Sequence, residues 1–125
     1  MIKIRRIYEP EEPGEQYRVL IDRLWPRGIS KEKAGWDKWM KEIAPSDQLR
    51  KWYNHAPEKW EEFKDLYEKE LTDKQDQLNE LKTLEIKYKT LTLVYSSREK
   101  ELNNATALKE FLMKRPYSGQ LSIDK

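Results

Sequence analysis

The amino-acid sequence predicts a small α/β domain of three layers, with helices covering a short sheet that is at least partly parallel. Three observations indicate this class. Three segments are rich in β-branched and aromatic residues, and the apolar spacing between the second and the third is that of helices. A short loop and a further helix follow the third strand, which is half of a parallel strand–helix–strand unit. We expect one domain over residues 1–116 and a tail over residues 117–125.

The predicted strands are Ile2–Tyr8, Tyr17–Ile21 and Thr90–Tyr95. The second has a nearly continuous apolar run, which suits a strand buried on both faces. A Pro- and Gly-rich turn over residues 9–14 separates the first two strands. This connection is short enough for a hairpin, so an antiparallel pairing of these two strands stays open beside a parallel one.

Five helical segments are predicted from apolar periodicity and capping residues. They run from Ser30 as N-cap to Ile43, from Ser46 as N-cap over Asp47–Trp52, over Pro57–Leu71, over Asp73–Glu85 with Thr72 or Asp73 as N-cap, and from Asn103 or Asn104 as N-cap to a stop at Pro116. In the first segment, Trp36, Trp39, Met40 and Ile43 fall at the i, i+3, i+4, i+7 spacing. Pro57 suits the first turn of a helix. A short edge strand is expected at residues 120–123.

The composition excludes several classes of site. The chain has no cysteine, which excludes disulfides and thiol chemistry, and one histidine with scattered carboxylates gives no metal site. Four glycines build no dinucleotide fingerprint, so no cofactor is expected. A formal net charge of +2, with basic and acidic residues interleaved, argues against nucleic acid as a partner. No stretch approaches the roughly 20 apolar residues that span a bilayer, so we expect a cytoplasmic protein without a membrane partner and leave the oligomeric state open.

The most unusual stretch is Asp22–Gly28, which follows the second strand and combines two arginines, a carboxylate, a tryptophan and a Pro/Gly pair. Pro26 disfavours helix at the residue before it and Gly28 permits a positive φ, so this stretch is a loop. A second polar loop, Ser96–Asn103, follows the third strand. Because ligands bind outside the carboxyl ends of parallel strands, we expect both loops on one rim.

This rim would gather groups that suit a phosphate-like, nucleotide-like or carboxylate ligand. The predicted binding residues are Arg23, Trp25, Arg27, Ser96, Ser97, Arg98 and Asn103. Guanidinium groups, hydroxyls and the N–H groups at a helix start all bind anions, so an anionic small molecule is the expected partner. The alternative is structural: Arg23 or Arg27 pairs with Asp22 or a helical carboxylate and holds the loop against the core, and Trp25 packs beneath the loop.

His55 and Asp22 are the candidates for catalysis. Histidine is the residue type whose ordinary pKa suits proton transfer near neutral pH, and a carboxylate can act as its partner. Ser96 or Ser97 would complete a Ser-His-Asp set, although no nucleophile-elbow spacing supports one. The alternative is that His55 hydrogen-bonds the start of the helix at Pro57.

Several separated pieces of the chain carry a family resemblance. They are Val19–Gly28, Ala44–Ser46, Leu49–His55, Pro57–Trp60, Thr92–Tyr95, Asn103 and Leu108–Leu112. With these pieces the chain resembles the DUF488 family, and in particular its YeaO-like branch. The resemblance covers nearly the whole chain, and its first piece is long and composed of rare residues. It implies an α/β fold and no established reaction, because the family is named as a domain of unknown function.

The chain departs from that family pattern at three places. Ala56 and Leu102 stand where the resemblance implies aspartate and histidine, and the absent aspartate would be a helix cap worth about 1 kcal/mol. Tyr95–Arg98 lacks the cysteines of more distant members, so any thiol chemistry of those relatives is absent here. The predicted function is a small-molecule binding domain or enzyme with an anion site at the strand ends. The alternative is a non-catalytic protein-interaction module with a structural Asp22–Gly28 loop.

Overall fold

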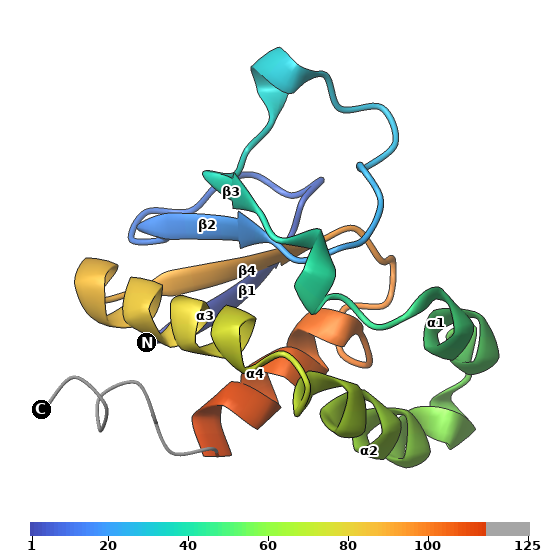
Figure 1. Cartoon of the computed structure of the whole chain (residues 1–125). Coiled ribbons are helices and arrows are strands. Elements are labelled where there is room, and N and C mark those ends of the chain that lie inside the picture. Colours follow the sequence, from blue (N-terminus) through green and yellow to red (C-terminus); the bar gives the residue numbers. More distant parts are fainter. Residues whose placement is uncertain (115–125) are drawn as a thin grey trace, which may run out of the picture.

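The computed structural model describes residues 1–114, and a sheet of four strands lies at its centre (Figure 1). The strands are β1 (Ile2–Arg6), β2 (Tyr17–Leu20), β3 (Lys38–Trp39) and β4 (Leu91–Tyr95), in the spatial order β1-β4-β2-β3. Every neighbouring pair is parallel, which confirms the α/β class and the parallel sheet. Because β4 lies between β1 and β2, the antiparallel alternative for the first two strands is wrong.

Side chains alternate across the sheet and define two cores. Along β4, Leu91, Leu93 and Tyr95 enter a large core, and Val94 enters a small core on the opposite face. All the residues of β4 are buried, as expected for a central strand that is covered on both faces. The two cores are covered by different kinds of structure.

The α-helices pack on one face of the sheet, where their buried residues join the large core (Figure 1). They are α1 (Asp47–Tyr53), α2 (Trp60–Leu71), α3 (Gln75–Tyr88) and α4 (Asn104–Lys114), and the 3₁₀ turn η3 (Pro57–Lys59) precedes α2. Helices are thus confirmed at four of the five predicted segments. From α2, Phe63, Tyr67 and Leu71 are at most 2% exposed, because positions four apart share one face of a helix.

Two predicted N-caps are present. Ser46 Oγ accepts a hydrogen bond from the Leu49 N–H at 3.1 Å, and Asn103 Oδ1 accepts one from the Thr106 N–H at 2.9 Å. Each bond satisfies a backbone donor that the first turn of a helix leaves without a partner. The two caps fix where α1 and α4 begin, and both helices begin beside the strand ends.

The other predicted caps are wrong. The N-cap position of α3 is Lys74, which makes no side-chain capping bond, and Thr72 instead donates its hydroxyl to the Lys69 carbonyl. Ser30 also makes no capping bond with the turn that follows it. Both segments begin with 3₁₀ or irregular turns. In these turns, backbone carbonyls accept the hydrogen bonds from the N–H groups that a cap would have satisfied.

The helix predicted from Ser30 to Ile43 is wrong. This segment forms the 3₁₀ turn η1 (Lys31–Lys33), the two-residue strand β3 and the 3₁₀ turn η2 (Lys41–Ile43). Its apolar residues serve two different cores: Met40 and Ile43 join the large core, whereas Trp36 and Trp39 pack on the small one. A helix would turn all of them to one side, so an extended segment satisfies both cores where a helix cannot.

A loop layer over residues 22–39 covers the second face of the sheet. Figure 1 shows it on the opposite side of the sheet from the helices. Ile29, Trp36 and Trp39 pack there on the small core formed by Ile7, Leu20 and Val94. The third layer of the domain is therefore irregular chain instead of helix.

Two predictions lie outside the described residues: the end of the last helix at Pro116 and the edge strand at 120–123, which belongs to the tail. Within residues 1–114, none of the helices has the length and apolar character needed to cross a membrane.

Candidate functional site

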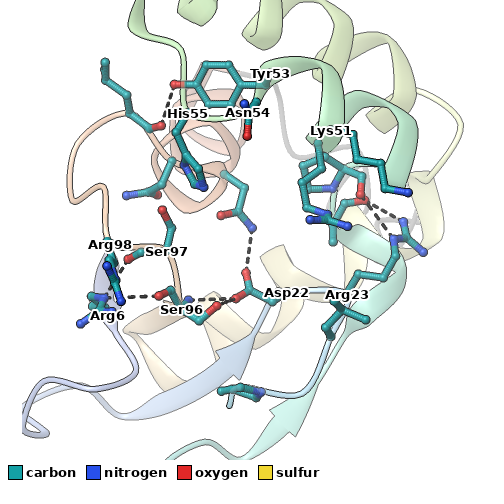
Figure 2. Close-up of a pocket in the computed structure, with 18 of the residues that line it drawn as sticks. Arg6, Asp22, Arg23, Lys51, Tyr53, Asn54, His55, Ser96, Ser97 and Arg98 are labelled. Carbon is teal, nitrogen blue, oxygen red and sulfur yellow. Dashed lines mark hydrogen bonds between the residues drawn. The ribbon is translucent and has the colours of Figure 1, made fainter.

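A pocket of about 950 Å³ lies at the edge of the sheet where its strands end (Figure 2). Arg6 is the last residue of β1, Asp22 lies two residues beyond β2, and Ser96 follows β4; all three line the pocket. The parallel register places these strand ends side by side. The geometry therefore provides the rim that the sequence predicts.

All the residues predicted for binding or catalysis line this pocket. They are Asp22, Arg23, Trp25, Arg27, His55, Ser96, Ser97, Arg98 and Asn103. Three further cations line it that sequence reasoning missed: Arg6, Arg50 and Lys51. Among the described residues, the lining thus holds six arginines or lysines and one carboxylate, in a chain with 25 basic and 23 acidic residues. Such a local excess gives the strand ends a positive potential.

A signal for the missed cations exists in the sequence. Arg50 and Lys51 lie within Leu49–His55, one of the pieces that carry the family resemblance, and Arg6 ends the first predicted strand. Charged residues on a short helix suit a solvated face equally well. Only the packing of α1 beside the strand ends distinguishes the two interpretations.

Asp22 holds the floor of the pocket together. Its Oδ2 accepts hydrogen bonds from the Ser96 N–H at 2.8 Å and from the Ser96 hydroxyl at 2.6 Å, and its Oδ1 accepts from the Asn104 side-chain amide at 3.0 Å. The Asp22 carbonyl accepts from Trp39 Nε1 at 2.7 Å. This one residue joins the loop after β2 to the end of β4 and the start of α4, and both of its carboxylate oxygens are hydrogen-bonded.

Arg23 holds the same loop against the chain before α1. Its Nε donates to the Pro45 carbonyl at 3.3 Å and its Nη2 to the Ala44 carbonyl at 3.1 Å. Lys74 Nζ donates to that Ala44 carbonyl as well, at 3.1 Å. Burial lowers the pKa of Lys74, and the nearby charge of Arg23 lowers it further. Arg23 is therefore an anchor whose partners are backbone carbonyls, not the carboxylate that the structural alternative expected.

The chain before α1 is also held from below by α2. The buried Tyr67 hydroxyl donates to the Ile43 carbonyl at 2.6 Å. Burial raises the pKa of Tyr67, and the carboxylates of Glu70 and Asp22 raise it further. Glu70 accepts hydrogen bonds from the Ser46 N–H at 2.9 Å and from the Ser46 hydroxyl at 2.6 Å. Tyr67 and Glu70 therefore hold, from the core side, the same stretch of residues 43–46 that Arg23 contacts from the pocket.

Trp25 and Arg27 lie at the lip of the pocket. Trp25 Nε1 donates to the Ile29 carbonyl at 2.6 Å, and its ring meets two tryptophans of the loop layer edge-on. With 36% of its surface exposed, Trp25 packs against these two tryptophans and leaves part of its side chain open to solvent. The Arg27 carbonyl accepts from the Tyr8 hydroxyl at 2.7 Å. The exposed Arg27 side chain makes no hydrogen bond or ion pair with the described residues.

The loop between β4 and α4 contributes both structural and open groups. Asn103, which is 2% exposed, donates its side-chain amide to the Glu99 carbonyl at 2.8 Å, besides capping α4. Ser97 Oγ accepts from the Glu99 N–H at 3.1 Å, and the Ser97 carbonyl accepts from Arg6 Nε at 2.8 Å. Arg98 is exposed and has no hydrogen-bond or ion-pair partner within residues 1–114.

His55 lies across the pocket from Asp22 in Figure 2. Asn54 and His55 have φ values of 45° and 57°, a left-handed conformation that costs non-glycine residues free energy. The imidazole makes no hydrogen bond with the part of the chain that the structure describes, so neither Asp22 nor the start of the next helix binds it. Backbone N–H groups lower the pKa of the nearby Glu99 carboxyl, and the charge of His55 lowers it further.

The arrangement suits an anion. Arg27, Lys51 and Arg98 are exposed cations in the lining that have no hydrogen-bond or ion-pair partner among the described residues. Across residues 1–114, no cluster of three or more histidine, cysteine or acidic side chains is placed to hold a metal ion. The chemistry that the lining offers is therefore charge-assisted hydrogen bonding.

Fold and site define an α/β domain with a cationic pocket at the carboxyl ends of its parallel strands. The chain belongs to the DUF488 family: residues 1–120 match the family model described as the inactive DUF488-N3 subclade. This match confirms the resemblance that the Asp22–Gly28 motif and the other separated pieces carry.

Relatives of the chain are found in several bacteria. It is 38% identical over 111 residues to the uncharacterized protein YeaO of Escherichia coli, covering 89% of this chain and 96% of that protein. It is 44% identical over 72 residues to the uncharacterized proteins Rv3073c of Mycobacterium tuberculosis and Mb3100c of Mycobacterium bovis. These 72 residues are 58% of this chain and span 61% of the length of the mycobacterial relatives. No solved structure matches the chain.

Proposed function

We propose that this protein is a non-catalytic binding domain for an anionic small molecule of phosphate or nucleotide type, held at the carboxyl ends of the strands. The composition of the pocket supports this most: six arginines or lysines and one carboxylate among the described lining residues. Guanidinium and ammonium groups bind phosphate through charge-assisted hydrogen bonds. A cleft lined by charges of one sign also concentrates ligands of the opposite sign.

The hydrogen bonds of the pocket separate its used charges from its unused ones. The Asp22 carboxylate accepts three hydrogen bonds, so the one negative charge of the described lining is directed into the floor. Arg27, Lys51 and Arg98 are exposed and make no hydrogen bond or ion pair within residues 1–114. These three cations are the groups that a ligand would contact first.

Acid–base catalysis by His55 and Asp22 stays a prediction that the hydrogen-bond geometry does not favour. Within the described residues no hydrogen bond joins the two, and both Asp22 carboxylate oxygens accept bonds from other donors. A general base needs a hydrogen-bond path to the proton that it takes. The chain also belongs to a subclade described as inactive. Binding without chemistry is therefore the function we propose.

Calorimetric titration with inorganic phosphate and with ATP, at low ionic strength, tests the proposal. The variants are a pocket triple, Arg27→Ala with Lys51→Ala and Arg98→Ala, and a matched control triple, Lys31→Ala with Lys33→Ala and Lys69→Ala. The control residues are exposed and lie outside the pocket. Each triple therefore removes three positive charges, and the triples differ only in where those charges lie. We expect the pocket triple to weaken binding at least about tenfold and the control triple to leave it nearly unchanged.

Two results would contradict the proposal. One is the absence of any phosphate or ATP binding by the wild-type protein. The other is an equal loss of affinity in both triples, because that would assign the binding to net charge alone. Melting temperatures measured on the same samples show that each triple is folded.

A second candidate function is protein interaction at the lip, and the exposure of Leu24 favours it. Leu24 is 64% exposed next to the partly exposed Trp25. Exposed apolar side chains that lie together suit contact with another protein. Sedimentation of the wild type and of Leu24→Ser tests this candidate. This candidate is supported if the wild type associates with a second protein chain and Leu24→Ser does not. It also requires that neither protein binds phosphate.

A further inference from the structure

We propose that the ligand of this pocket carries two separated anionic groups joined by a neutral spacer. The inference rests on the proposed function, because it specifies the ligand of the same pocket. It comes from the distribution of the cations that line the pocket. Arg27 lies at the lip, and the other five form two groups on opposite sides, which we name the β4 wall and the α1 wall.

The β4 wall consists of Arg6, Ser97 and Arg98. Arg6 Nε donates to the carbonyls of Ser96 and Ser97 at 3.3 Å and 2.8 Å, which fixes this guanidinium beside the loop after β4. The guanidinium carbon also lies 4.7 Å from the centroid of the Tyr8 ring. Neither Nη atom of Arg6, and no atom of the Arg98 guanidinium, makes a hydrogen bond within residues 1–114. This wall therefore offers two positive charges with unused donors.

The α1 wall consists of Arg23, Arg50 and Lys51. Arg23 donates through Nε and Nη2 to the chain before α1, and its Nη1 has no partner among the described residues. Arg50 makes an exposed ion pair with Asp47 at 3.3 Å, which a ligand can replace at little cost. Lys51 has no hydrogen-bond or ion-pair partner within residues 1–114. In Figure 2, Arg23 and Lys51 lie on one side of the pocket, and Arg6 and Arg98 lie on the other.

The part of the floor that lies between the two walls is polar and, among the described residues, contains no arginine or lysine. It is formed by Asp22 with Ser96 and Asn104, whose hydrogen bonds are directed to one another. The Asp22 carboxylate repels an anion placed at the centre of the pocket. Asn54, which is exposed on the facing side, has an amide that can hydrogen-bond a hydroxyl. The centre therefore favours a neutral group over an anion.

The size of the pocket agrees with a ligand that reaches both walls. Its volume of about 950 Å³ is in the upper part of the roughly 300–1,000 Å³ range of pockets that hold drug-sized molecules. A single phosphate on the β4 wall would leave Lys51 without an ion-pair partner among the described residues, and a single phosphate on the α1 wall would leave Arg98 without one. Linking two anionic groups makes the second contact intramolecular, which raises affinity without any new kind of contact.

Calorimetry with probes of graded spacing tests this inference. The probes are alkanediol bisphosphates with chains of increasing length, each compared with the alkyl monophosphate of the same length. In methylenebisphosphonate the two anionic groups are one carbon apart. This probe is the control for a ligand that has two anionic groups but is too short to reach both walls. We expect affinity to pass through an optimum with length, where the bisphosphate binds about 100-fold tighter than its monophosphate. We expect methylenebisphosphonate to bind at least about tenfold more weakly than this best bisphosphate.

One variant from each wall sharpens the test. Arg98→Ala on the β4 wall and Lys51→Ala on the α1 wall should each lower the affinity of the best bisphosphate about tenfold and flatten its dependence on length. Lys33→Ala, an exposed cation outside the pocket, should leave both unchanged. All three side chains are exposed, so the folded state should tolerate each substitution.

The outcomes separate this inference from the proposed function. If the bisphosphates bind no tighter than the monophosphates or methylenebisphosphonate, the proposal of a ligand that reaches both walls is wrong. The proposed anion site is not contradicted by that result. The same holds if Lys51→Ala leaves bisphosphate affinity unchanged and Arg98→Ala lowers it. If no probe binds the wild-type protein at all, the proposed function itself is wrong.

Discussion

The floor of the pocket and its rim are both polar but use their side chains differently. The floor consists of Asp22, Arg23, Ser96, Asn103 and Asn104, and the rim consists of Arg27, Lys51, His55 and Arg98. Each floor side chain hydrogen-bonds another part of the chain. Within residues 1–114, no rim side chain makes a hydrogen bond or an ion pair. The two regions therefore differ in whether their polar side chains already have partners within the chain.

The comparison shows that one short motif can serve two purposes. Asp22 and Arg23, at the start of the Asp22–Gly28 loop, are bonded into the floor, whereas Arg27 near its end is exposed at the lip. Buried or bonded polar groups cost stability when their partners are removed, and exposed cations do not. Substitutions in the floor should therefore change stability, and substitutions in the rim should change binding.

The largest effect is expected at Asp22. Asp22→Ala should lower the free energy of unfolding by about 3 kcal/mol, because the Ser96 and Asn104 donors lose their acceptor in a partly buried place. Urea denaturation measures this loss. Asp47→Ala removes an exposed carboxylate and should cost less than about 0.5 kcal/mol. A loss below about 1 kcal/mol at Asp22 would contradict its role in the floor.

The two arginines of the motif provide the next test. Arg23→Gln should cost about 1–2 kcal/mol, because two hydrogen bonds to backbone carbonyls are lost. Arg27→Gln should cost less than about 0.5 kcal/mol, because its side chain is exposed. The same denaturation experiment compares them. Equal costs at the two positions would remove the distinction between floor and rim.

Tyr67 extends the floor into the core and gives it a pH dependence. Tyr67→Phe should cost about 1 kcal/mol at neutral pH through the lost bond to Ile43. Because the pKa of Tyr67 is raised in the folded state, its stabilising effect is complete below about pH 10 and is lost as the pH rises above that value. The melting temperature of the wild type should therefore fall more steeply above pH 10 than that of the variant. Parallel curves for the two proteins would contradict this account.

The smallest effect on stability is expected at the rim. Arg98→Ala should change the free energy of unfolding by less than about 0.5 kcal/mol and lower phosphate affinity several-fold. Thermal melting and calorimetric titration of one sample measure both quantities. Destabilisation of the free protein by more than about 1 kcal/mol would place Arg98 in the floor instead.

The sequence predicts the position of the site better than its internal bonds. The strands at Tyr17 and Thr90 are recognisable from local patterns, and parallel strands place the loops that follow them at one edge of the sheet. The partners of Asp22 could not be predicted, because they lie 74 and 82 residues away along the chain. Tertiary packing decides that both carboxylate oxygens of Asp22 accept hydrogen bonds, and it also decides that the Arg98 side chain is exposed.

The segment before α1 shows a second limit of pattern reading. Trp36, Trp39 and Met40 have the spacing of a helix, yet they are divided between two cores on opposite faces of the sheet. A periodicity argument assumes a single buried side, and that assumption fails where a segment at the edge of the sheet contributes side chains to both cores. The cations of α1 were missed for a related reason, since their direction depends on where the helix packs.

The most direct test of the account is a ¹H–¹⁵N NMR titration of the wild-type protein with inorganic phosphate. If phosphate binds at the rim and leaves the floor unchanged, the largest chemical-shift changes should occur at the amides of Arg27, Lys51, His55 and Arg98. These changes should saturate as the phosphate concentration rises. The amides of Ile2–Ile4 in β1 and Leu91–Leu93 in β4, which lie outside the pocket lining, should barely move. Shifts that are absent from these rim residues, or that concentrate on the surface of α3, would contradict the account.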